Sequence, residues 1–423
     1  MSGKTSADSS TAHGSLWRDR DFMSLWTGQT VSDLGSAMTV LVLPLIAVTA
    51  LDASTTEVGL LGAAATVAWL LVPLPAGALV DRVAKRRLMV LCDVVRCVVA
   101  AAVPVAAVLG GLHIGHLVVV AFLLGTFAVV FEVSWQSYVP ELLPTNRLTD
   151  GISRIATTNA VAAVVGPSLA GLAILLVPVT GVLLIDAVSF AVSAATLLFI
   201  RAKDRPAPSR KLDVREQLLG GLRFAWNHPV LRRVVACSAT ANFFDAITTT
   251  LVVVFLVRDL GASSSTTGIV LGIGAAGGVV GGLLVRRLAA RVGESRLLWL
   301  GKLSVGWLTA LIPFAPNGPG VLMVSIGLFA NSSCVVLYNV LQITYRQSVC
   351  PPELRGRMNA AIRWTIRGVI PIGSLLAGLL GDAVGLRPVL LVSALGAWLA
   401  VGWVFFSPLR RMRDLQAELT SPR

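Results

Sequence analysis

Two acidic residues, Asp33 and Glu132, lie inside long apolar stretches of the sequence, where a charge has little water to solvate it. An ionisable residue in such a stretch is costly and indicates function by default. A buried carboxyl can hold a proton at neutral pH and release it when water or a cation reaches it. Both residues are therefore candidates for proton exchange or substrate contact. The alternative is that Glu132 only pairs with a helix-end arginine such as Arg154.

A second polar group lies in the other half of the chain. Asp245 lies in an apolar stretch, and Arg363 and Arg367 are one helical turn apart, so they share a face. These residues are further candidates for coupling or substrate binding, because the arginines can balance a carboxylate or contact an anionic substrate. A purely structural ion pair is the alternative.

Other polar and aromatic residues in apolar stretches have a plainer interpretation. Asp93 and Arg96 are three residues apart and are expected to pair, and Asp186 is also interpreted as structural. Five aromatic residues are candidates for a cavity wall, with helix packing or lipid contact as the alternative: Phe131, Trp135, Phe243, Phe244 and Trp364.

Long apolar segments must position all of these residues. Of the 423 residues, 55% are hydrophobic and only 13% are charged, whereas soluble domains carry about 25% charged residues. This composition excludes a soluble enzyme and predicts an integral membrane protein. A helix of about 20 apolar residues crosses a bilayer. Twelve segments qualify, at residues 22–49, 56–80, 88–109, 116–138, 152–177, 181–200, 230–257, 265–285, 297–314, 319–343, 358–380 and 386–406.

The basic residues predict the orientation of these spans. The formal net charge is +13, and 29 of the 35 Lys and Arg residues fall on the side of the two termini. The opposite side has only Arg258 and Arg387. By the positive-inside rule both termini are cytoplasmic. The basic excess therefore reflects membrane orientation, and no nucleic-acid partner is expected.

The chain divides into two related halves. Residues 136–142 are similar to 347–354, and 77–82 to 282–287, at equivalent places in each half. We therefore expect a cytoplasmic tail (1–21), an N-terminal six-helix bundle (22–200), a connector (201–229), a C-terminal six-helix bundle (230–406) and a second cytoplasmic tail (407–423). Within the connector, residues 213–226 are predicted to form an amphipathic helix on the cytoplasmic face.

Several motifs resemble one transporter family. Residues 77–90, GALVDRVAKRRLMV, resemble the loop 2/3 signature of the major facilitator superfamily, and residues 164–171, VVGPSLAG, are similar to its drug–proton antiporter motif. Residues 25–29, 93–96, 186–190 and 355–357 resemble the branch that contains macrolide-efflux proteins and the enterobactin exporter. The resemblance covers residues 25–409. It implies twelve transmembrane helices in two pseudo-symmetric six-helix bundles, with the substrate site between them.

The loop 2/3 resemblance implies a gate. Gly77 would allow close helix approach, and Asp81 would accept hydrogen bonds at the helix N-terminus near Met358. Arg82 and Arg86 would bind neighbouring carboxylates or lipid phosphates. This contact would hold the outward-facing state and break on switching.

The antiporter motif implies a bent, tightly packed helix. Pro167 removes a backbone donor, whereas Gly166 and Gly171 remove side-chain bulk. Such a helix would seal the cavity against leakage.

Together these features predict a secondary active exporter of hydrophobic or amphipathic small molecules, such as drugs or antibiotics. Proton antiport and alternating access would drive it. The alternatives are a proton-coupled uptake carrier or a metabolite or siderophore transporter of the same fold, or a non-transporting membrane sensor or scaffold. We expect a monomer in the plasma (inner) membrane that works with substrate, protons and the lipid bilayer, with no enzymatic activity, cofactor or metal.

Overall fold

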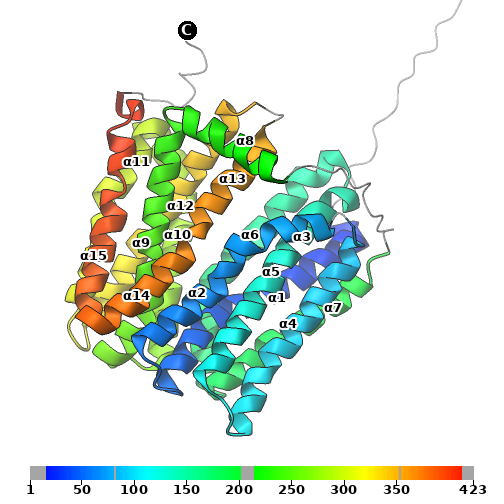
Figure 1. The fold of residues 1–423 in the computed structure, drawn as a ribbon, viewed down its shortest axis with the longest axis vertical. Helices are drawn as coiled ribbons and strands as arrows, with labels where there is room; N and C mark the ends of the chain where they lie inside the picture. The colour runs from blue at the N-terminus through cyan, green and yellow to red at the C-terminus, as the bar shows by residue number, and fades with distance from the viewer. Residues whose placement is uncertain (1–15, 81, 202–213, 352–353, 412–423) are drawn as a thin grey trace, which may run out of the picture.

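The structure is a computed structural model that describes residues 16–80, 82–201, 214–351 and 354–411. Helices joined by short connections make up this part of the chain (Figure 1). Eleven helical segments in it are long and apolar enough to cross a membrane. The remaining expected span, residues 56–80, is divided between two shorter helices. The prediction of an all-helical membrane protein is thus confirmed.

In the first half, the first two spans begin with side-chain capping signals, and the second is broken by a proline. The Asp19 carboxylate accepts a hydrogen bond from the Phe22 amide before the first helix, and Ser54 and Glu57 form a capping box before the second. The second span breaks before Pro73, which has no amide hydrogen and suits the first position of a new helix. The helices are α1 (Arg20–Thr49), α2 (Thr55–Leu71), α3 (Pro73–Val80), α4 (Lys85–Val108), α5 (Ile114–Leu142), α6 (Thr145–Ala173) and α7 (Val182–Leu198).

The second half has six spans, four of them interrupted. One ends in a π-helical turn (Phe255–Asp259), one continues as a 3-10 helix (Gly306–Phe314), one divides before Pro371, and the last divides between Leu399 and Gly402. The helices are α9 (Leu231–Val254), α10 (Ser264–Val292), α11 (Glu294–Val305), α12 (Gly320–Val349), α13 (Arg355–Gly368), α14 (Ile370–Val384), α15 (Leu386–Leu399) and α16 (Gly402–Phe405).

The connector contains a helix where the sequence predicts one. Helix α8 (Val214–Asn227) lies across the ends of the second-half helices and packs on α13 (Figure 1). Phe224 and Ala225 pack with Met358 and Ile362 of α13. We call the side of the molecule that carries α8 the connector face, and the opposite side the far face. The connector helix is therefore attached to the second half.

The two halves pack most extensively toward the far face. There a single apolar core combines residues of both halves, such as Leu45 and Ile46 with Leu251 and Val254. Toward the connector face each half has its own core. The contacts between halves are mainly α2 against α14 and α6 against α10 (Figure 1). The halves are therefore joined at the far face and diverge toward the connector face.

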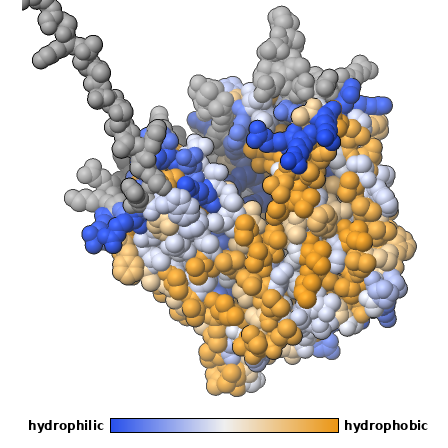
Figure 2. Space-filling view, turned by 180° about the vertical axis from the view of Figure 1, so that it is seen from behind, coloured by the Kyte–Doolittle hydropathy of each residue, from blue (hydrophilic) through white to orange (hydrophobic). Residues whose placement is uncertain are grey.

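The surface fits a bilayer. Figure 2 shows a broad hydrophobic band over the flanks of the helices, with hydrophilic residues gathered toward the connector face. Between the two halves the surface is recessed near the same face (Figure 2). Large apolar side chains such as Leu176, Leu283 and Phe406 are exposed. An apolar surface of this extent is stable in lipid but not in water.

Candidate functional site

Two adjoining cavities lie between the halves, and Trp69 of α2 lines both. The larger, of about 390 Å³, is lined by α1, α2, α4, α5 and α7 of the first half and by α9 and α14 of the second. The smaller, of about 230 Å³, lies between α2, α3, α5 and α13. We call the larger the deep cavity and the smaller the mouth cavity, because α13 and the end of α5 lead to the connector face.

Backbone approach closes the deep cavity at the far face. A Cβ added at Gly59 of α2 would lie 2.7 Å from the Cα of Gly378 in α14, and one at Gly268 of α10 would lie 2.6 Å from the Cα of Gly171 in α6. No side chain fits at these points. Glycine is what allows the helices of the two halves to pack so closely.

Polar contacts reinforce this closure. The Asp382 carboxylate of α14 accepts hydrogen bonds from the amides of Thr55 (3.0 Å) and Thr56 (2.8 Å), at the N-terminus of α2. The Arg258 guanidinium donates to the Asp52 carboxylate (3.1 Å) and the Ala53 carbonyl (2.6 Å). An anion at a helix N-terminus is favoured by the orphan amides and the helix dipole. Both contacts join one half to the other.

Three buried charged residues form the first charge cluster of the site, which we call the deep cluster. Arg96 pairs with Asp93 one turn away on α4, as the spacing predicted. Asp186 of α7 accepts hydrogen bonds from the Thr39 hydroxyl and from the Ser189 hydroxyl (3.1 Å). Arg96 and Asp186 both line the deep cavity. The interpretation of Asp186 as purely structural did not foresee this position.

Two phenyl rings enclose Arg96. Its guanidinium carbon lies 4.7 Å from the centroid of Phe131 and 4.3 Å from that of Phe190. Cation–π contacts of this kind strengthen when water is excluded. They hold the guanidinium at the cavity wall, between Asp93 and Asp186.

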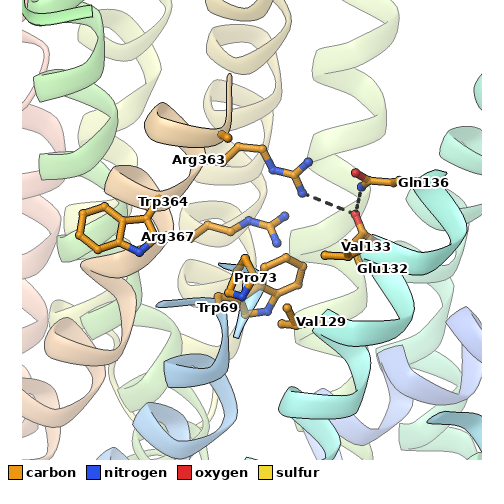
Figure 3. A pocket seen from close by; sticks show the side chains of 10 residues that line it. Trp69, Pro73, Val129, Glu132, Val133, Gln136, Arg363, Trp364 and Arg367 are labelled. Atoms are coloured by element: carbon orange, nitrogen blue, oxygen red, sulfur yellow. Dashed lines mark hydrogen bonds and ion pairs between the residues drawn. The ribbon is translucent and has the colours of Figure 1, made fainter. Parts of the chain in front are cut away.

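The second charge cluster, the mouth cluster, consists of Glu132, Arg363 and Arg367 (Figure 3). Arg363 and Arg367 extend from α13 toward Glu132 on α5, and the Arg363 guanidinium lies 3.5 Å from the Glu132 carboxylate. The Arg367 guanidinium stacks 3.8 Å from the Trp69 ring centroid. The sequence therefore identified the charged lining of the mouth cavity, although Glu132 pairs with Arg363 of the other half and not with Arg154.

Asp33 lies outside the lining of both cavities. It is on α1, where Gln29 donates a long hydrogen bond of 3.5 Å to one carboxylate oxygen, and its other oxygen is buried without a partner in the described structure. Asn159 of α6, Arg96 and Glu132 lie nearby. Asp33 thus lies between the deep and mouth clusters and is close enough to interact electrostatically with Arg96 of one and Glu132 of the other.

Asp245 belongs to the interior of the second half. Its carboxylate accepts a hydrogen bond of 3.1 Å from Asn331 of α12, and Lys302 of α11 lies near it. Neither cavity described above includes Asp245 in its lining. Its proposed contact with substrate has no support in this conformation.

Among the described residues, one of the five candidate aromatic residues lines either of these two cavities. Trp364 lines the mouth cavity and donates a hydrogen bond of 3.0 Å to the Leu70 carbonyl of the first half. Phe131 packs behind Arg96, and the Trp135 indole donates to Glu132 (3.0 Å). Phe243 and Phe244 stack on each other, with Phe244 against Gly396. For these four residues the packing alternative describes the structure.

The structure describes three of the four predicted gating residues, Gly77, Arg82 and Arg86. Asp81 lies outside the described residues. A Cβ at Gly77 would meet no atom within 4 Å, so Gly77 makes no close helix contact here. Arg82 is exposed, and Arg86 donates to the Ile200 carbonyl within the first half. The contact of Asp81 with the helix N-terminus near Met358 stays a prediction.

The antiporter motif packs as its residue types suggest. A Cβ at Gly166 would lie 2.4 Å from the Cβ of Ala37 in α1, and one at Gly268 would lie 2.8 Å from the Pro167 carbonyl. Gly171 meets α10 of the other half. The motif therefore contributes directly to the closed far face.

Sequence reasoning missed Trp69 and underrated Arg96 and Asp186. Trp69 lies in an apolar span with no distinctive neighbour, so its position at the junction of two cavities gives no local signal. For Arg96 and Asp186 the signal existed, since both are ionisable residues within spans. In the described ranges no three His, Cys, Asp or Glu side chains gather as a metal site would require.

Comparison with known proteins agrees with this geometry. The sequence profile of the Major Facilitator Superfamily matches residues 25–372. The Multidrug efflux pump Tap of Mycolicibacterium fortuitum is 27% identical over 400 residues, which cover 91% of this chain and 95% of that protein.

Solved structures with the same fold include transporters of low sequence identity. A mutant of the nucleoside transporter NupG superposes with a TM-score of 0.75 at 12% identity, covering 91% of this chain and 98% of that one. A bacterial homologue of the human lysosomal transporter Spinster, in an inward-facing and unoccupied conformation, gives a TM-score of 0.69 at 14% identity, covering 93% and 97%.

Proposed function

Because this chain belongs to the Major Facilitator Superfamily, and so is a multi-pass membrane transporter and not an enzyme, we propose that it exports amphipathic small molecules by proton antiport. The observation that carries the proposal is a cavity between the halves that is closed at the far face and leads toward the connector face. The similarity to a multidrug efflux pump over 91% of the chain supports export.

The distribution of basic residues predicts which face of the protein is cytoplasmic. The connector face is the cytoplasmic side if the positive-inside rule holds for this chain. The structure then corresponds to the inward-facing state, which receives substrate from the cytoplasm. Alternating access requires a second state in which the far face opens and the predicted loop 2/3 contact closes the connector face.

Asp33 and Glu132 are the proposed proton carriers. Glu132 faces the mouth cavity, and Asp33 lies between the clusters with one oxygen unpartnered. A proton on Glu132 would remove its attraction for Arg363, and so would loosen a contact between the halves. Protonation would in this way be linked to the relative position of the two halves.

Accumulation of a fluorescent drug in cells tests the proposal. Cells that make the protein should accumulate less dye than control cells, and an uncoupler that collapses the proton gradient should abolish the difference. Accumulation that rises with the protein and falls with the uncoupler would indicate uptake instead. No difference across a broad panel of compounds would favour a non-transporting role.

A further inference from the structure

The two charge clusters of the site differ in the sign of their charge. The mouth cluster has two guanidinium groups, from Arg363 and Arg367, and one carboxylate, from Glu132. The deep cluster has one guanidinium group, from Arg96, and two carboxylates. With all groups ionised, the mouth of the site is positive and its depth is negative.

The surplus positive charge of the mouth cluster is available to a ligand. Arg367 forms no hydrogen bond to any residue that the structure describes; its guanidinium lies over the Trp69 ring, and the side chain lines the mouth cavity. Five N–H donors in a flat fork match a carboxylate or sulfonate. Within the described part of the chain, Arg363, one turn away, is held by the long 3.5 Å contact to Glu132.

The surplus negative charge of the deep cluster is on Asp186. Arg96 is already paired with Asp93, whereas hydroxyl groups alone, from Thr39 and Ser189, donate to Asp186. Asp33 lies beside Arg96 and adds further negative charge on this side. Arg96 is the cation near both Asp93 and Asp186, so the cluster has one carboxylate in excess, and a buried excess carboxylate favours a ligand ammonium group.

The space between the clusters is apolar. Trp69 lines both cavities, and Leu61, Ala65 and Leu124 line the deep cavity next to it. Such walls suit a flat hydrophobic body. A ligand with only a cationic group would be repelled at the mouth, and one with only an anionic group would be repelled at depth.

We propose that the site binds zwitterionic amphipaths, with the anionic group at Arg363 and Arg367 and the cationic group at Asp186. This inference rests on the proposed export function and specifies its substrate class. The wall residues contact the aromatic body between the two charged groups.

Three probes with one aromatic skeleton test the inference on the purified full-length protein. They are an arylpiperazine carboxylic acid, which is a zwitterion, its methyl ester, which is a cation, and its N-acetyl derivative, which is an anion. Calorimetric titration should give the tightest binding for the zwitterion. The loss of one charged contact should weaken binding about tenfold or more.

Two variants test the contacts of the anionic and cationic groups of the ligand separately. Arg367→Gln should weaken binding of the zwitterion and the anion but not of the cationic ester, for which it removes a repulsion. Asp186→Asn should weaken binding of the zwitterion and the ester but not of the anion, for the same reason. The control Arg223→Gln, an exposed residue of α8, removes the same charge outside both cavities and should change none of the three affinities.

Two results would overturn the inference. One is an ester that binds the wild-type protein as tightly as the zwitterion; the other is an Arg367→Gln variant that binds all three probes as the wild type does. If Asp186→Asn fails to fold, the probe series on the wild type and on Arg367→Gln still decides. If the protein exports dyes but shows no preference for zwitterions over cations and anions, the proposed substrate class is wrong and the proposed export function still stands.

Discussion

Arg96 shows how strongly one buried residue can depend on its partners. It is 6% exposed, Asp93 is fully buried, and the two form an ion pair between phenyl rings. Breaking such a pair by removing one member costs about 3–5 kcal/mol, because the other charge stays buried without compensation. Arg96→Leu should therefore lower the midpoint of thermal unfolding in detergent.

The double variant Arg96→Leu, Asp93→Leu is the informative control for this prediction. It removes both charges, so it should recover a good part of the lost stability. If Arg96→Leu unfolds at the wild-type temperature, the pair contributes nothing, and the enclosure of Arg96 has no energetic role.

A second prediction at the residue scale concerns proton coupling. Asp33→Asn and Glu132→Gln keep the shape and most hydrogen bonds of each side chain but cannot exchange a proton. Each should lose most of the drug efflux that a proton gradient drives, while still exchanging drug down its own concentration gradient. Transport into inverted vesicles, with and without an imposed pH gradient, measures both quantities.

Asp150→Asn is a matched control for the coupling prediction, because Asp150 is exposed on α6 and lines neither cavity. It should retain gradient-driven efflux. Full proton-driven efflux in both Asp33→Asn and Glu132→Gln would show that other groups carry the proton.

The sequence identified residues whose chemistry stands out against their surroundings. A charge within an apolar span is conspicuous, and Glu132, Arg363 and Arg367 do meet in one cavity. The partner of each charge depends on how distant helices align, so the pairing of Glu132 across the two halves was not predictable. The sequence could not tell which candidate aromatic residues line a cavity in this conformation, since phenylalanine and tryptophan serve packing and cavity lining equally well.

At the scale of elements, glycine contacts determine how the halves meet. Gly268 of α10 faces Gly171 and the Pro167 carbonyl of α6, with no room for a Cβ. Gly268→Ala should therefore disfavour the closed far face by about 1–3 kcal/mol, the usual cost of overpacking. Spin labels at Leu176, after α6, and Asn317, before α12, can be used to measure the distance between the halves by pulsed electron–electron double resonance. In Gly268→Ala a larger fraction of molecules than in the wild type should show the long distance of an open far face.

Gly301→Ala is the matched control for Gly268→Ala. Gly301 lies on α11, where an added Cβ meets nothing within 4 Å. That variant should leave the distance distribution unchanged and stabilise its helix slightly, because alanine lowers the entropy of the unfolded chain. Identical distributions in Gly268→Ala and the wild type would mean that the seam tolerates the methyl group.

Element positions were predictable because length and hydropathy determine a membrane span. The interruptions of helices within spans were not predictable. The span at residues 56–80 divides before Pro73, and that at 358–380 divides before Pro371. Proline inside a span either kinks a helix or starts a new one, and neighbouring helices decide between them.

At the scale of the whole molecule, orientation remains a prediction that labelling can check. Arg223→Cys introduces an exposed thiol on α8, at the connector face. In a background without the native cysteines, a membrane-impermeant maleimide should label this thiol only after the membrane is opened or inverted. Labelling in intact cells would reverse the assignment of sides, and with it the direction in which the observed cavity opens.

The glycine seams also bear on the energy that each transport cycle requires. Moving one charge across a potential of 100 mV supplies about 2.3 kcal/mol, which is close to the value of burying a single leucine side chain, about 1.5–3 kcal/mol. A contact that interlocked several leucine side chains would require more energy than this to separate. Where Gly59 meets Gly378 and Gly171 meets Gly268, no side chains interlock, so these contacts themselves add little to the cost of separation. The energy that one ion supplies is therefore left for the apolar core that the halves share around Leu45 and Leu251, which is the larger part of the cost of opening the far face.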